Sequence, residues 1–170
     1  MSCFGGMAGG GLSEGLTRLK GEHPALRAQM EELYNLTQKI DQEINVEDSF
    51  NELIIKVKGF KDDLDPHSER EEGVLFPMMG AYIGTTSGPI VVMEYEHDQA
   101  KSNIGAFLDK AEVGESTTVD KKNLAELVQN SYFILTDHFN KEENVLFPMA
   151  ERMLSDDEKS ELLRKIQEIQ

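Results

Sequence analysis

The 170-residue sequence contains one cysteine, Cys3, and no tryptophan. A single cysteine excludes an intramolecular disulfide and favours a cytoplasmic location, where thiols stay reduced. No apolar run approaches the roughly 20 residues that a membrane-spanning helix needs, and the N-terminus lacks the basic and apolar regions of a signal peptide. Lysine and arginine total 17 against 32 aspartates and glutamates, which gives a net charge of −15. This acidic balance argues against nucleic acid or an anionic membrane as a partner.

Apolar residues recur at steps of three and four over most of the chain, without the alternation that is typical of strands. We therefore expect an all-α protein. Its expected parts are a flexible glycine-rich leader at 1–12, a helical domain at 13–154 and a short C-terminal helix at 155–170 packed on that domain. Within the domain, long helices are expected over 13–44, from 46–48 to the loop at 84–89, over 89–113 and over 119–154. The apolar residues expected to face the core are Leu26, Met30, Leu33, Leu36 and Ile40 in the first helix and Phe50, Leu53, Ile54, Val57, Phe60 and Leu64 in the second. Four helices with short links favour an up-down-up-down four-helix bundle.

Three local signals refine these helices. Pro24 predicts a kink or a restart just after His23, because proline disrupts a helix interior but suits a first turn. Asp65-Pro66 resembles an N-cap followed by the first helical position, so a kink or restart is predicted there as well. Ser155 and Glu158 have the spacing of a capping box for the last helix, expected over 156–168.

The sequence contains two copies of one motif, HSEREEGVLFPM at 67–78 and HFNKEENVLFPM at 138–149. His67 and His138 lie 71 positions apart, and Glu71 and Glu142 keep the same separation. This spacing indicates an internal repeat of two helices. Residues four apart share one helix face, so each copy presents an imidazole and a carboxylate in the same direction.

The four histidines fall at similar depths in the expected bundle. His23 and His97 lie early in the first and third helices, and the repeated pair lies late in the second and fourth. An up-down-up-down topology brings these positions into one layer. A lone histidine on a helix is more often a core or surface residue than a ligand, but four at one depth, two with glutamate at i+4, favour a metal site.

Neighbouring residues have simpler interpretations. Leu-Phe-Pro in each copy is interpreted as core packing with a proline that bends or loosens the last helical turns. Glu72 and Glu143 lie about 140° around the helix from their histidines, which predicts a second-shell or surface role. Tyr34, Tyr95 and Tyr132 are interpreted as core tyrosines.

The predicted metal ligands are His23, His67, Glu71, His97, His138 and Glu142. Imidazoles and carboxylates without a thiolate disfavour structural zinc and iron–sulfur clusters, and they suit iron, with manganese or zinc as alternatives. Two equivalent triplets indicate two ions. If both carboxylates bridge the two ions, and an oxo or hydroxo group bridges them as well, each ion keeps one open coordination position. Such a centre would bind dioxygen, peroxide or nitric oxide.

These residues resemble the hemerythrin-like HHE cation-binding family over about residues 15–152. The matching pieces are His23, both His-x-x-x-Glu pairs with their Leu-Phe-Pro tails, and Glu-His97-Asp. The resemblance implies a four-helix bundle with a non-haem diiron centre, held by the six residues above. Oxygen-carrying hemerythrins use five histidines and this chain has four, which argues against reversible oxygen carriage. The ligand set is similar to the iron-binding domain of diiron proteins that repair iron–sulfur clusters.

Three kinds of function are therefore considered. The first is a diiron protein that binds or reacts with a small oxidant in a stress response. The alternatives are an iron donor or repair factor that acts on the damaged cluster of a client iron–sulfur protein, and an iron storage or sensor module without turnover. How tightly the protein holds iron distinguishes the diiron protein that reacts with an oxidant from the iron donor.

Overall fold

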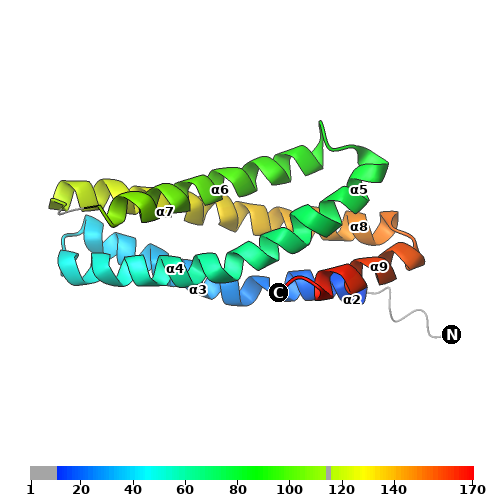
Figure 1. Cartoon of the computed structure of the whole chain (residues 1–170), viewed down its shortest axis with the longest axis horizontal. Coiled ribbons are helices and arrows are strands. Elements are labelled where there is room, and N and C mark those ends of the chain that lie inside the picture. The colour runs from blue at the N-terminus through cyan, green and yellow to red at the C-terminus, as the bar shows by residue number, and fades with distance from the viewer. Residues whose placement is uncertain (1–10, 114–115) are drawn as a thin grey trace. The chain divides into compact units, whose positions relative to one another are not determined.

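The structure is a computed structural model of the chain that describes residues 11–113 and 116–170. Every regular element in these residues is helical, which confirms the all-α prediction (Figure 1). The expected leader at 1–12 falls mostly on residues 1–10, which lie outside the described residues. Within the described ranges, no helix has both the length and the apolar character needed to cross a membrane.

The helices follow one another with short connections. In chain order they are α2 (Glu14–Gly21), α3 (His23–Asp41), α4 (Val46–Arg70), α5 (Phe76–Ile83), α6 (Pro89–Ala111), α7 (Thr118–Lys141), α8 (Phe147–Met153) and α9 (Asp156–Gln167). Two single π-helical turns, η1 (Glu71–Leu75) and η2 (Glu142–Leu146), join α4 to α5 and α7 to α8. The capping box of α9 is confirmed, because Ser155 accepts from the Glu158 amide and the Glu158 carboxylate accepts from the Ser155 amide.

The two prolines predicted to interrupt helices behave differently. Between α2 and α3, Glu22 is not helical, and α3 begins at His23 with Pro24 in its first turn. This confirms the predicted restart to within a residue or two. At Pro66, where a kink or a restart was predicted, the restart is wrong because α4 continues as one α-helix through the proline to Arg70, and the kink stays a prediction. Proline removes only one helical hydrogen bond, and the other bonds of a helix of 25 residues persist on both sides.

A π-turn directly precedes the Phe-Pro pair in each copy of the repeat. The amides of Phe76 and Phe147 donate to the carbonyls five residues back, on Glu71 and Glu142. The next residue in each copy is proline, which has no amide proton and cannot continue an α-helical ladder. The wider turn accommodates this interruption, so the helix loosens immediately after each His-x-x-x-Glu pair. Single π-turns are frequent at functional sites.

The predicted core faces are buried. On α3 the stripe has an exposure of at most 5% and consists of Leu26, Met30, Leu33, Leu36 and Ile40. On α4 the predicted inward residues have an exposure of at most 3%, except the half-buried Ile54, and they are Phe50, Leu53, Val57, Phe60 and Leu64. In both repeats the leucine and phenylalanine of Leu-Phe-Pro are 0–1% exposed, which confirms their interpretation as core residues.

The chain divides into two compact units. Unit 1 consists of the chain up to His23 together with Pro66–Val92 and Phe139–Gln170, and unit 2 consists of Pro24–Asp65 and Met93–His138. Each unit therefore collects segments that are distant in sequence, and each contains some of the predicted ligands.

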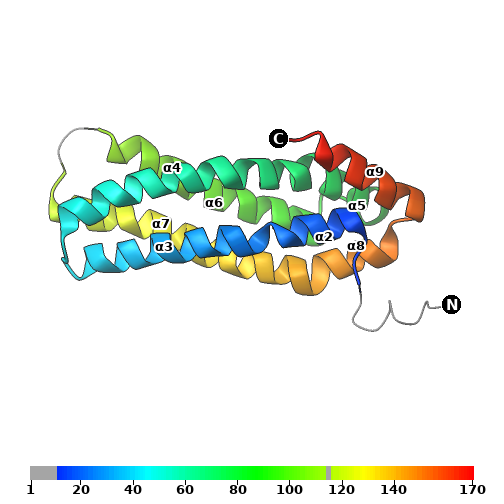
Figure 2. The same cartoon turned by 90° about the horizontal axis from the view of Figure 1, so that it is seen from below.

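In unit 2, the long segments of α3, α4, α6 and α7 run side by side (Figures 1 and 2). Phe50 of α4 packs edge-on against Phe107 of α6, with ring centroids 5.8 Å apart. Tyr34 of α3 stacks on Tyr132 of α7 at 4.5 Å. These contacts between non-consecutive helices form one core, which buries the apolar faces predicted from the sequence.

In unit 1, α2 and α9 approach closely at Gly15. A Cβ atom added at Gly15 would lie 3.2 Å from Cγ of Leu162, so a glycine suits this crossing. The carboxylate of Glu151 in α8 accepts hydrogen bonds from the Ser13 amide at 2.7 Å and is paired with Lys159 of α9 at 3.0 Å. These contacts connect the start of α2 with α8 and α9.

Candidate metal centre

Unit 1 brings four of the six predicted ligands into one cluster, namely His23, His67, Glu71 and Glu142. One ligand atom from each residue lies within 4.8 Å of the others, and every member is at most 1% exposed. His23 begins α3, His67 lies in the last turn of α4, and the two glutamates begin η1 and η2. The π-turns therefore start at the carboxylates that belong to the cluster.

The Nδ1 atom of each histidine in this cluster is held by a glutamate from a distant part of the chain. Nδ1 of His23 donates to Oε2 of Glu143 at 2.7 Å, and Nδ1 of His67 donates to Oε1 of Glu22 at 2.7 Å. A carboxylate that accepts the Nδ1 proton fixes the ring orientation and directs the Nε2 lone pair to the opposite side. This is the arrangement that metal-binding histidines commonly show.

The Nε2 atoms face the two buried carboxylates. Nε2 of His23 lies 3.1 Å from Oε1 of Glu142, and Nε2 of His67 lies 3.3 Å from Oε2 of Glu71. Neither Nε2 atom makes a hydrogen bond with a residue that the structure describes. Burying two carboxylates is costly unless a cation neutralises them. The residues therefore fit a metal ion, and nitrogen and oxygen donors of this kind suit non-haem iron.

The electrostatics of the cluster favour positive charge. Burial disfavours the charged form of His67, but the carboxylates of Glu71 and Glu22 outweigh this effect and raise the pKa of His67 to about 10. Glu22 also accepts from Nη1 of Arg70 at 2.7 Å, and Nη2 of Arg70 donates to the carbonyl of Ile169 at 3.0 Å. The same negative field that stabilises the protonated imidazole would stabilise a metal cation.

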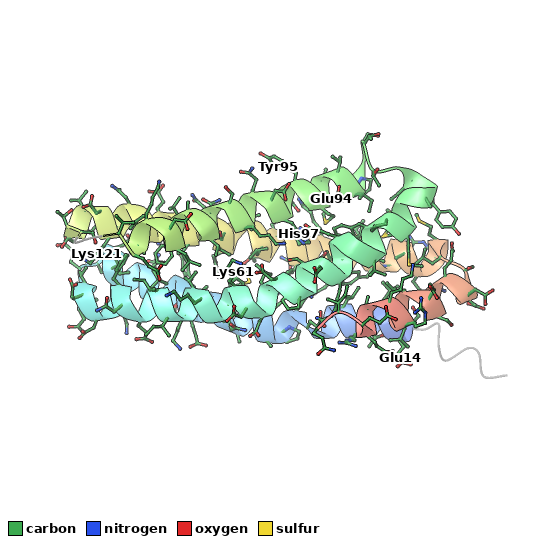
Figure 3. All side chains as sticks on the ribbon, viewed as in Figure 1. Glu14, Lys61, Glu94, Tyr95, His97 and Lys121 are labelled. Atoms are coloured by element: carbon green, nitrogen blue, oxygen red, sulfur yellow. The ribbon has the colours of Figure 1, made fainter. Side chains whose placement is uncertain are left out.

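Unit 2 contains the other two predicted ligands, His97 of α6 and His138 of α7. Their ring centroids lie 4.4 Å apart, and the residues are 2% and 0% exposed. Nδ1 of His138 donates to Oε1 of Glu96 at 2.9 Å, which repeats in this unit the histidine–carboxylate pairing seen in unit 1. Figure 3 shows where His97 lies on α6.

The interpretation of Tyr95 as a core residue is wrong. Its side chain is 63% exposed on the outer side of α6 (Figure 3). Residues two apart on an α-helix are separated by about 200°, so the inward position of His97 requires Tyr95 to face outward. Tyr34 and Tyr132 are half-buried, and the Tyr132 hydroxyl donates to Glu31 at 2.6 Å.

Sequence reasoning missed Glu22 and Glu96 as partners of ligand histidines. A signal was present, because each glutamate directly precedes a histidine, in Glu22-His23 and Glu96-His97. In each case the glutamate contacts the histidine of a His-x-x-x-Glu motif in another helix. Glu143 was predicted to have a second-shell or surface role, and the structure places it against His23.

A helical chain that collects buried imidazoles and carboxylates in this way has the features of a metal-binding protein. The chain belongs to the hemerythrin family, whose HHE cation binding domain matches residues 14–150. The match includes all six predicted ligands.

Several relatives are named as iron–sulfur cluster repair proteins. The chain is 31% identical over 137 residues to YtfE of Dickeya chrysanthemi (strain Ech1591), which covers 76% of this chain and 61% of that protein. It is 30% identical over 129 residues to DnrN of Neisseria gonorrhoeae, which covers 74% of this chain and 82% of that protein. The chain thus spans about three-fifths of the length of the YtfE protein and most of the length of DnrN.

Proposed function

We propose that this chain is a non-haem diiron protein. Two iron ions with an oxo or hydroxo bridge are held by His23, His67, Glu71, His97, His138 and Glu142. The observation that carries the proposal is the pair of imidazoles in unit 1, whose Nδ1 atoms are held by glutamates while their Nε2 atoms face buried carboxylates. His97 and His138, in contact with each other in unit 2, complete the set. Manganese or zinc would suit the same donors.

The proposal includes an arrangement of the helices. An up-down-up-down bundle over 13–154 places the starts of the first and third long helices beside the ends of the second and fourth. This topology would bring His97 and His138 to the carboxylates of Glu71 and Glu142. The short connections between successive helices and the sequence spacing of each His-x-x-x-Glu pair support it.

The biological role proposed here is the repair of iron–sulfur clusters under oxidative or nitrosative stress, in the cytoplasm. The names of the relatives support the repair role, and a damaged iron–sulfur protein would be the client. When bound, the iron pair would supply open coordination positions and one-electron redox chemistry towards dioxygen, peroxide or nitric oxide. The chain orients the ligand imidazoles through Glu22, Glu96 and Glu143 and excludes bulk water by burial.

A second candidate function is iron donation to a damaged cluster. A donor must release iron. The four residues of the unit 1 cluster, however, are at most 1% exposed, and Nδ1 of each histidine is hydrogen-bonded to a glutamate. Burial of this extent favours retained iron and therefore chemistry at the centre. A storage or sensor module without turnover is the remaining alternative.

Iron retention distinguishes reaction from donation. The iron-loaded protein is incubated with an excess of a ferrous chelator through repeated cycles of reduction and reoxidation. We expect most of the iron to remain bound. Rapid loss, together with iron transfer to a protein whose cluster has been damaged by nitric oxide, would establish the donor function instead.

The ligand set is tested by replacing His138 with alanine. The variant His138→Ala should lose at least one iron per chain, because the histidine belongs to the proposed set and is fully buried. Tyr95→Ala is the control, since this exposed residue lies outside the set. Wild-type iron content in His138→Ala would reject the assignment.

A further inference from the structure

The two copies of the repeat differ at the residue that follows each ligand histidine. The first copy reads His67-Ser68 and the second reads His138-Phe139. The carboxylate four residues after each histidine is kept in both copies. The copies therefore provide the same ligand types but different neighbours, one with a small hydroxyl and one with an aromatic ring.

The ring of Phe139 covers one side of the cluster in unit 1. It is fully buried, and its ring stacks on the ring of His23 with centroids 4.1 Å apart and planes 16° apart. The same ring meets His67 edge-on at 5.8 Å. An apolar ring against two imidazoles blocks a polar small molecule from that side of the cluster.

Ser68 occupies the equivalent position in the first copy. It is 1% exposed, and its hydroxyl makes no hydrogen bond with any residue that the structure describes. A serine inside a helix ordinarily donates to a carbonyl one turn back, and this hydroxyl does not. A buried polar group without a partner destabilises the folded protein, so this hydroxyl is available to a partner that is not part of the chain. Ser68 lies directly after one proposed ligand and three residues before another, Glu71.

We infer that the Ser68 hydroxyl is the hydrogen-bond donor to the small molecule that binds at the proposed iron pair. The inference rests on the proposed function and specifies its substrate class, a molecule of two or three atoms that accepts a hydrogen bond. Because Phe139, at the corresponding position of the second copy, covers the rings of His23 and His67, the small molecule approaches the iron pair from the side that Phe139 leaves uncovered. The two metal positions are therefore not equivalent, although their ligands repeat.

The test uses azide as a triatomic hydrogen-bond acceptor and measures its dissociation constant by visible absorption on the iron-loaded protein. In Ser68→Ala we expect the dissociation constant to rise about tenfold, while the iron content stays at the wild-type value. The metal-free Ser68→Ala protein should unfold at the same temperature as the wild type or higher, because alanine removes a buried hydroxyl without a partner. Ser68→Phe, which copies the second repeat, should abolish azide binding; if it does not fold, Ser68→Ala alone decides.

Ser131→Ala is the matched control. Ser131 is 3% exposed, and its hydroxyl donates to the carbonyl of Ala100 at 2.9 Å. We expect this variant to unfold at a lower temperature and to bind azide as the wild type does. Wild-type azide affinity in Ser68→Ala, or no azide binding to the wild-type protein loaded with two irons, would overturn the inference alone. A wild-type protein that takes up no iron would overturn the proposed function as well, and the iron measurement separates the two failures.

Discussion

Nδ1 of His23 donates a hydrogen bond of 2.7 Å to Oε2 of Glu143, which lies 120 residues away in the sequence. His23 is fully buried and Glu143 is partly exposed, so the carboxylate connects the ring to the protein surface. The bond fixes the ring with Nε2 directed to Glu142. In this way η2 supplies both a candidate ligand and the group that orients another.

Replacing Glu143 with alanine should weaken iron binding without removing a ligand. The imidazole of His23 would lose the acceptor that sets its orientation and its basicity, and losses of this kind typically cost about 10–100-fold in metal affinity. The measurement is competition for iron with a chelator of known affinity. Glu143→Gln should lose less, because its amide oxygen still accepts from Nδ1. Glu69→Ala, at an exposed position, is the control, and equal affinities in Glu143→Ala and the control would contradict the prediction.

Replacing Arg70 with glutamine should lower stability, because Arg70 connects Glu22 to the carbonyl of Ile169. Its side chain is only 12% exposed. Charge-assisted hydrogen bonds of this kind predict a loss of roughly 1–3 kcal/mol in the free energy of unfolding, measured in urea. Arg164→Gln is the control, since its 57% exposed side chain pairs with Glu161 and Glu168, three and four residues away, and exposed pairs of this kind contribute little to stability. Equal losses in the two variants would show that the Arg70 network does not stabilise the fold.

The contribution of Glu151 should depend on pH. Burial raises the pKa of this carboxyl, but hydrogen bonds from Ser13 and Lys159 outweigh burial and lower the pKa below its ordinary value of 4.5. A lowered pKa in the folded state adds stability that is complete above pH 4.5 and is lost as the pH falls through the folded-state value. Glu151→Gln should therefore destabilise the metal-free protein at pH 7 and have less effect below pH 4. A difference from the wild type that does not change with pH would contradict this account.

Removing the metal should destabilise the protein, because iron that binds only the folded state adds its binding free energy to folding. At an iron concentration of about 100 times the dissociation constant the gain is about 2.7 kcal/mol. Thermal unfolding of iron-loaded and metal-free protein measures the difference. An identical unfolding temperature for the two forms would show that iron does not bind preferentially to the folded chain.

The sequence predicted the helical class and most helix boundaries, because apolar periodicity and capping residues are local signals. The Ser155–Glu158 capping box and the glycine-bounded loop after α5 are examples. At Pro66 the local signal allowed a kink or a restart, and the restart did not occur. A proline can begin a helix or lie inside one, and only packing along the whole of α4 decides between the two.

The candidate ligands could be selected from the repeat and from the similar depths of the four histidines, but the glutamates that hydrogen-bond to those histidines could not. The pairs Glu22–His67 and Glu96–His138 each join side chains more than 40 residues apart. The Glu-His dipeptides mark the two glutamates, but the local pattern does not specify which histidine each one contacts. The π-turns were anticipated only as loosened helix ends. Their exact form depends on how the chain passes the proline while keeping Glu71 and Glu142 buried.

The central claim is tested most directly by measuring iron per chain on protein purified without chelators and reconstituted under anaerobic conditions. The account predicts two iron ions per chain in the wild type. It also predicts loss of iron in His67→Ala, which removes a ligand of the unit 1 cluster. One iron in the wild type would contradict the paired centre. No iron would mean that the repeated motif and its buried glutamates contribute only to packing of the helices, and the account would be wrong.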